Sequence, residues 1–169
     1  MMNFSDAVKS VLTQYFKFSG RARRSEYWWF YLFTILVAIV AGIIDGAIMG
    51  WENADSGPVG NMTSLALFIP SLSVGWRRLH DTGRSGWWIG GLFIAIFAFA
   101  MIAGIMALGS AGLSSDREFG GLMALIIIGA IGLFIYAIAI LVFLCQDSHR
   151  DDNKYGPSPK YGSQKSVFD

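Results

Sequence analysis

The sequence predicts an all-α, polytopic membrane protein with four transmembrane helices and an N-terminal amphipathic helix at the membrane interface. Of its 169 residues, 54% are hydrophobic and only 15% are charged, against about 25% charged in soluble domains. The uncharged residues gather in long runs, and about 20 apolar residues in a helix cross a hydrocarbon core of roughly 30 Å. Lysine and arginine are confined almost entirely to alternate connecting segments.

Residues 1–25 are predicted to form a cytoplasmic amphipathic helix followed by a basic segment. Apolar side chains recur at helical spacing between residues 4 and 17, and polar side chains take the opposite face. This pattern fits a helix packed against its neighbours as well as a helix lying in the membrane interface, so both interpretations stay open. Gly20 is expected to end the helix, and Arg21, Arg23 and Arg24 follow it.

Residues 26–146 are predicted to form the four-helix membrane domain, with helices at about 27–49, 59–76, 87–109 and 121–145. The second run is the weakest, because Pro70 and several hydroxyls interrupt it; a proline is nevertheless tolerated in a membrane helix. Small residues every four positions predict a close packing face, either within the bundle or between two copies; in the first run they are Ala38, Gly42, Gly46 and Gly50.

The distribution of positive charge predicts the orientation. If all four runs cross, both termini, the 77–86 segment and the polar tail (147–169) lie on one side of the membrane. Twelve of the thirteen lysines and arginines are then on that side, and only Arg117 is on the other. The positive-inside rule therefore places both termini in the cytoplasm. All six tryptophans also fall at predicted membrane interfaces, where their amphipathic rings are favoured.

The candidate functional surface is the cytoplasmic turn WRRLHDTGRSGWW (76–88), together with the basic segment at 21–24. Arginine forks suit phosphate oxygens, and basic clusters beside a membrane bind anionic lipid headgroups. The same charges are also explained by topology and local pairing alone, for example between Arg77 and Asp81 at i, i+4. The residues singled out are Arg21, Arg24, Arg77, Arg78, His80, Asp81 and Arg84.

Two rival functions remain open. Asp45 is the one carboxylate within a spanning run, and an intramembrane acid is a candidate for transport; with the second helix it defines a small transporter or channel subunit. A lipid-headgroup enzyme with a metal is the less favoured reading, because its ligand types lack tight spacing: His80, Asp81, Asp147, His149, Asp151 and Asp152. We expect no catalytic residue, no cofactor and no metal, and a net charge of +1 gives no reason to expect nucleic-acid binding.

Three motifs resemble the domain of unknown function 805 family of YhaH-like bacterial inner-membrane proteins: FSGRARRSEYW (18–28), RRLHDTGRSGWW (77–88) and NKYGPSP (153–159). The resemblance implies a small multi-pass protein of the bacterial inner (plasma) membrane and supplies no activity. It also implies that the three motifs form one cytoplasmic unit, which adds Asn153 and Tyr155 to the candidate site. We therefore expect a non-enzymatic membrane component that binds an anionic lipid headgroup or a protein partner there, or that forms a homo-oligomer.

Overall fold

The computed structural model describes residues 2–51, 57–110 and 116–160, and in these ranges the chain is helical with no strand. The prediction of an all-α fold is confirmed. The predicted connections at 52–56 and 111–115 and tail residues 161–169 lie outside the described residues. The helices are α1 (Phe4–Thr13), α2 (Arg24–Met49), α3 (Pro58–Asp81), α4 (Trp87–Ser110) and α5 (Asp116–Cys145). They divide between two compact units, residues 1–86 with 146–169 and residues 87–145.

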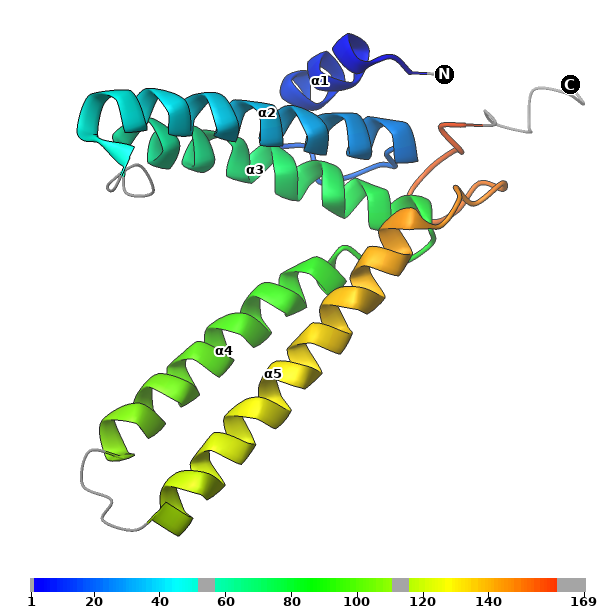
Figure 1. Ribbon diagram of the computed structural model, residues 1–169. Coiled ribbons are helices and arrows are strands. Elements are labelled where there is room, and N and C mark those ends of the chain that lie inside the picture. Colours follow the sequence, from blue (N-terminus) through cyan, green and yellow to red (C-terminus); the bar gives the residue numbers. More distant parts are fainter. Residues whose placement is uncertain (1, 52–56, 111–115, 161–169) are drawn as a thin grey trace, which may run out of the picture. The chain divides into compact units, whose positions relative to one another are not determined.

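Helix α1 packs on α2 and α3 within the first unit (Figure 1). Asn3 caps its start by accepting a hydrogen bond from the amide of Asp6 at 2.8 Å. Ala7 and Val11 are fully buried, whereas Leu12 and Phe16 on the flank remain exposed. The apolar face is thus used, at least in part, for packing against neighbouring helices; contact with the membrane interface stays a prediction.

Helices α2 and α3 form an antiparallel pair that is tied at both ends (Figure 1). At one end the amide of Ala22, just before α2, donates to the carbonyl of Arg77 at 3.1 Å. At the other end the Asp45 carboxylate accepts from the amides of Val59 and Gly60 at the start of α3. Between the two ends, a small apolar core joins α1, α2 and α3 and includes Val11, Ala22, Phe30 and Val74.

Helix α3 extends five residues beyond its predicted end at 76 and stops at Asp81. The charged side chains of this last turn are buried and have partners elsewhere in the unit. Gly83, at φ +77°, follows the end of the helix in the left-handed conformation that favours glycine. The predicted 77–86 turn is therefore in large part helix.

Three of the described helices are long and apolar enough to cross a membrane: α2, α4 over 87–106 and α5 over 121–145. Helix α3 does not reach that level, because Pro70, its hydroxyls and its charged last turn lower its hydropathy. The fourth crossing therefore stays a prediction.

In the second unit, α4 and α5 form a helical hairpin. The Tyr136 hydroxyl on α5 donates to the carbonyl of Trp88 on α4 at 3.0 Å. Two glycines permit the close approach, because a Cβ added at Gly91 would lie 2.9 Å from the Tyr136 hydroxyl and one at Gly129 would lie 2.5 Å from the Phe99 ring. By contrast, a Cβ at Gly42 on α2 meets nothing within 4 Å among the described residues. The close packing face predicted for the small residues of α2 therefore stays a prediction.

Candidate functional site

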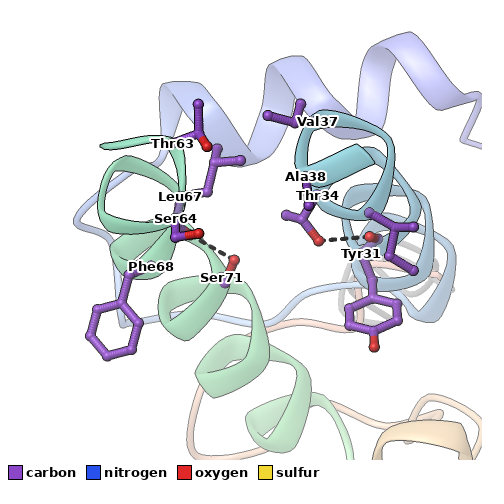
Figure 2. A pocket seen from close by; sticks show the side chains of 10 residues that line it. Tyr31, Thr34, Val37, Ala38, Thr63, Ser64, Leu67, Phe68 and Ser71 are labelled. Carbon is purple, nitrogen blue, oxygen red and sulfur yellow. Dashed lines mark hydrogen bonds between the residues drawn. The ribbon is translucent and has the colours of Figure 1, made fainter. Parts of the chain in front are cut away.

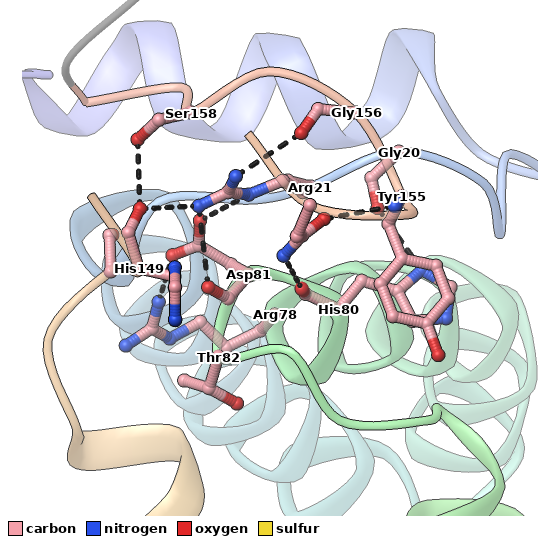
Figure 3. Close-up of polar contacts among 12 residues, drawn as sticks. Gly20, Arg21, Arg78, His80, Asp81, Thr82, His149, Tyr155, Gly156 and Ser158 are labelled. Carbon is pink, nitrogen blue, oxygen red and sulfur yellow. Dashed lines mark hydrogen bonds and ion pairs between the residues drawn. The ribbon is translucent and has the colours of Figure 1, made fainter. Parts of the chain in front are cut away.

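A buried polar cluster lies where the end of α3, the segment before α2 and the polar tail meet (Figure 3). Its centre is Asp81, whose Oδ1 accepts from Arg21 Nε at 3.0 Å. The other oxygen, Oδ2, pairs with Nη1 of Arg78. All three side chains are at most 1% exposed. One carboxylate thus compensates two arginines, and each partner depends on the others for neutralisation.

Arg21 also fastens the tail to this cluster. Its Nη1 donates to the carbonyls of Asp151 at 2.9 Å and Gly156 at 3.2 Å, and its Nη2 donates to the carbonyl of His149 at 2.6 Å. Arg78 Nη2 donates to the carbonyl of Gln146. The guanidinium donors that would fit phosphate oxygens are therefore largely occupied by the protein's own carbonyls.

His80 is the second point at which the tail docks. Its ring stacks on Tyr155 with centroids 3.8 Å apart and planes 4° apart, and its carbonyl accepts from Asn153 Nδ2 at 2.9 Å. Nδ1 lies 3.1 Å from the carbonyl of Gly20 and must donate, since a carbonyl only accepts. His80 lies beyond the apolar part of α3, and burial lowers the pKa of its imidazole.

Arg77 belongs to a neighbouring network, so the predicted Arg77–Asp81 pair is wrong. Its Nη1 donates to Gln14 Oε1 at 3.1 Å and to Glu26 Oε1 at 3.3 Å, and Glu26 also accepts from the Ser10 hydroxyl at 3.0 Å. Arg77 thus turns towards α1 and α2, while Arg78, one position on, takes Asp81. The contacts of Arg77 with Gln14 and Glu26 thus take the place of the predicted i, i+4 pair with Asp81.

Three arginines share two carboxylates in the buried ion pairs. Arg21 and Arg78 pair with Asp81, and Arg77 pairs with Glu26. Arg77 Nε and Nη2 are buried without a hydrogen-bond partner among the described residues. A buried donor without an acceptor is costly, so an acceptor beside Arg77 would be favoured.

The remaining predicted arginines lie at the rim of the cluster. Arg84 Nη1 donates to Gln146 Oε1 at 2.6 Å. Arg24 lines a pocket of about 360 Å³ that we call the basic pocket. Its walls come from the start of α2, the N-terminal segment and the tail: Met2, Arg23, Arg24, Ser25, Asp147, Ser148 and Lys160.

The electrostatics of the basic pocket are positive overall. Three cationic side chains line it, and the carboxylate beside them, Asp147, is paired with Lys160 Nζ at 2.8 Å. The hydrogen bond from Lys160, with one from the amide of Ser148, lowers the pKa of the Asp147 carboxyl. The first turn of α2 also begins here, and its N-cap residue Arg23 makes no side-chain capping hydrogen bond, so the helix dipole adds to the positive potential.

The structure brings most of the predicted site together. Arg21, Arg78, His80, Asp81, Asn153 and Tyr155 share one contact network. Arg77, Arg84 and Arg24 lie around it with different partners. Sequence reasoning missed Glu26 and Lys160, although an acid next to the arginine run and a lysine in the polar tail were visible signals.

Asp45 lies apart from this cluster, and its side chain is fully buried. Its two oxygens accept from Val59 N at 3.0 Å and Gly60 N at 2.6 Å. This arrangement gives Asp45 a helix-capping role. The acids and histidines considered for a metal form no ligand cluster within the described ranges, and Asp81 and Asp147 are paired with basic side chains instead.

Long apolar helices, with a buried polar cluster gathered where two of them begin and end, are features of an α-helical membrane protein. The chain belongs to the family described as protein of unknown function (DUF805), whose model matches residues 15–157. The match contains the first two sequence motifs in full and residues 153–157 of the third.

Relatives from Escherichia coli (strain K12) agree with this assignment. Inner membrane protein YhaH is 33% identical over 156 residues, which cover 92% of this chain and 97% of YhaH. Inner membrane protein YhaI is 35% identical over 156 residues, covering 91% of this chain and 95% of YhaI. No solved structure matches the chain.

Proposed function

We propose that the chain crosses the membrane four times with both termini in the cytoplasm. The antiparallel pairing of α2 and α3 supports the fourth crossing. Helix α2, at 26 residues, is about 39 Å long and is apolar enough to span. Helix α3 is held beside it at both ends, by Ala22–Arg77 and by Asp45–Gly60. We therefore expect a helix fastened along a spanning partner in this way to cross with it.

Single cysteines test this topology on a Cys145→Ala background. A membrane-impermeant thiol reagent applied to intact spheroplasts is expected to label Met49→Cys and to leave Ser19→Cys and Ser85→Cys unlabelled until the membrane is opened. Labelling of Ser85→Cys from outside would remove the fourth crossing. Labelling of Ser19→Cys from outside would reverse the orientation.

On that cytoplasmic surface, we propose that the protein is a non-enzymatic component that binds the anionic headgroup of a phospholipid. The observation that carries the proposal is the basic pocket, where Arg23, Arg24 and Lys160 surround a cavity of about 360 Å³ at the start of a membrane helix. Arginine forks pair with phosphate oxygens, and basic groups at this depth attract anionic headgroups.

The proposed binding surface lies outside the buried residues Arg21 and Arg78. Arg21 and Arg78 donate to Asp81 and to tail carbonyls, so they hold the pocket wall in place. Arg24 and its neighbour Arg23 then contact the headgroup. Arg84, Asn153 and Tyr155 act by fixing the tail that contributes Lys160.

Lipid binding by the purified, full-length protein tests this function. Arg23→Gln combined with Arg24→Gln is compared with Lys9→Gln combined with Lys17→Gln, which removes the same charge elsewhere in this unit. At about 1 kcal/mol per basic residue, the first variant is expected to bind phosphatidylglycerol about 30-fold more weakly. The control variant is expected to match wild type, and phosphatidylcholine is expected to bind weakly to every form.

Two outcomes of this comparison would overturn the proposal. One is unchanged phosphatidylglycerol affinity in the Arg23→Gln, Arg24→Gln variant. The other is full competition by free glycerol phosphate at the same concentration as the lipid, which would assign the pocket to a soluble anion. Loss of a co-purifying protein without any change in lipid binding would favour a protein partner at this surface.

A further inference from the structure

A groove between α2 and α3 is lined by side chains of both helices (Figure 2). It has a volume of about 380 Å³. We call it the apolar groove; its lining residues include Tyr31, Thr34, Ala38, Ser64, Leu67 and Ser71. It lies between helices that the proposed topology places in the membrane, so lipid is the surrounding solvent.

Three of the hydroxyls in the apolar groove are already engaged within their own helices. Thr34 Oγ1 donates to the carbonyl of Tyr31 at 2.7 Å, Ser71 Oγ donates to the carbonyl of Leu67 at 2.6 Å, and Thr63 Oγ1 donates to the carbonyl of Val59 at 2.8 Å. Most of the groove surface is carbon, which suits a hydrocarbon occupant.

The register of α2 aligns the groove with the basic pocket. Tyr31 lines the groove and lies seven residues after Arg24, which lines the basic pocket. Residues seven apart share a helix face. Seven residues advance a helix by about 10.5 Å, so the groove begins about two turns deeper in the membrane than Arg24.

That depth matches the anatomy of a phospholipid. A bilayer of about 40–45 Å with a hydrocarbon core of about 30 Å leaves roughly 5–7 Å of headgroup region on each side. The acyl chains of a lipid whose headgroup is held at Arg24 therefore begin nearer the membrane surface than Tyr31 and extend past it.

We infer that the apolar groove holds an acyl chain of the same phospholipid whose headgroup occupies the basic pocket. The inference rests on the proposed function and extends it from headgroup recognition to recognition of the whole lipid. The bound lipid then spans the seam between α2 and α3, from the tail at the surface to mid-helix. Such a site selects for charge at one end and for chain length at the other.

Leucine substitutions that fill the groove provide the test. Ala38→Leu combined with Ser64→Leu places bulk into it from both helices, and Ala47→Leu combined with Ala66→Leu adds the same kind of bulk at other exposed positions of α2 and α3. Affinities are measured for dioleoyl and for dihexanoyl phosphatidylglycerol. The groove-filled variant is expected to bind the long-chain lipid about fivefold more weakly, equal to about 1 kcal/mol, and the short-chain lipid as wild type does.

The outcomes separate this inference from the proposed function. If long-chain affinity is unchanged in the groove-filled variant while Arg23→Gln with Arg24→Gln abolishes binding, the headgroup site stands and the acyl-chain site is wrong. If the groove-filled variant instead loses a dimer that wild type forms, the occupant is a helix of a second copy. That result also overturns the inference.

A measurement on the wild-type protein does not depend on how the variants fold. Phosphatidylglycerol with a photoactivatable group in its acyl chain is cross-linked in nanodiscs, and the labelled peptides are identified by mass spectrometry. Labelling is expected to concentrate in 31–38 and 63–71. Labelling spread evenly over the exposed faces of α2, α4 and α5 would contradict the inference.

Discussion

The Asp45 carboxylate, near the end of α2, caps the start of α3 by accepting a hydrogen bond from the amide of Gly60 at 2.6 Å. The preceding residue, Val59, donates to the other oxygen at 3.0 Å. The first amides of a helix lack partners within the helix, and Gly57 at the N-cap has no side chain to supply one. An acid from the neighbouring helix takes that place, so a charge within an apolar run has a structural explanation.

Removing this cap is expected to destabilise the α2–α3 pair. Asp45→Ala leaves two amides without an acceptor, at a cost of about 1–3 kcal/mol in the free energy of unfolding. Asp45→Asn keeps one acceptor and is expected to cost less. Thermal or denaturant unfolding in detergent measures both, with Asp151→Ala as the control because that side chain is exposed. Equal stability of Asp45→Ala and wild type would contradict the capping role.

Gly57 and Gly42 give a matched pair of glycine substitutions. A Cβ at Gly57 would lie 2.0 Å from Asp45 Cγ, whereas a Cβ at Gly42 meets nothing within 4 Å among the described residues. Gly57→Ala is therefore expected to displace the capping carboxylate and to lower the unfolding midpoint. Gly42→Ala, inside α2, is expected to be neutral or to stabilise by up to about 1 kcal/mol. The opposite ranking of the two midpoints would show that the Asp45–Gly57 contact is wrong.

Asp81 is expected to be the most sensitive acid in the polar cluster. Asp81→Asn leaves Arg21 and Arg78 buried without their shared carboxylate, at a cost of about 3–5 kcal/mol. Asp147→Asn breaks only an exposed pair with Lys160, worth about 0–1 kcal/mol. Unfolding measures the loss of stability in Asp81→Asn. The tail of this variant is also expected to be proteolysed faster, because Arg21 donates to three tail carbonyls. A stable Asp81→Asn variant with a protected tail would refute this arrangement.

The sequence was sufficient to predict that the helices form, because long apolar runs and helical periodicity are local signals. The end of the first helix was wrong, since Gly20 was expected to end it and α1 ends at Thr13. The family resemblance implied that residues of the 18–28, 77–88 and 153–159 motifs would meet, and Arg21, His80 and Tyr155 do. The extent of α3 was underestimated because charged residues were assigned to solvent. Burial of Arg77 and Arg78 needs partners that only the tertiary fold supplies.

The partners of Arg77 and Asp45 could not be predicted from sequence spacing. Arg77 has an acid four residues away at Asp81, yet it pairs with Glu26, which is 51 residues distant. Asp45 resembled a transport residue because helix periodicity does not reveal that the start of α3 lies beside it. In both cases the choice depends on which helices pack together, and hydrophobic periodicity leaves that undetermined.

The docking of the tail is expected to depend on pH through His80. Burial, with repulsion from Lys154, lowers the pKa of His80 below its ordinary value, although its hydrogen bond to Gly20 opposes the shift. The unfolded chain then binds the proton more tightly than the folded one. The contribution of neutral His80 to stability is therefore complete above the ordinary histidine pKa of about 6.5 and is lost as pH falls through the folded pKa. Asp147 does not interfere, because its pKa is lowered from an already acidic value.

Unfolding midpoints between pH 7.5 and 5 measure this effect in wild type and in His80→Phe, which keeps an aromatic ring against Tyr155 but does not titrate. The wild-type midpoint is expected to fall across this range, and that of His80→Phe, though lower at pH 7.5 for want of the bond to Gly20, is expected to change less. His149→Phe is the matched control, since the His149 residue is exposed, and it is expected to retain the wild-type slope. If His80→Phe and wild type show the same slope, protonation of His80 does not weaken the docked tail.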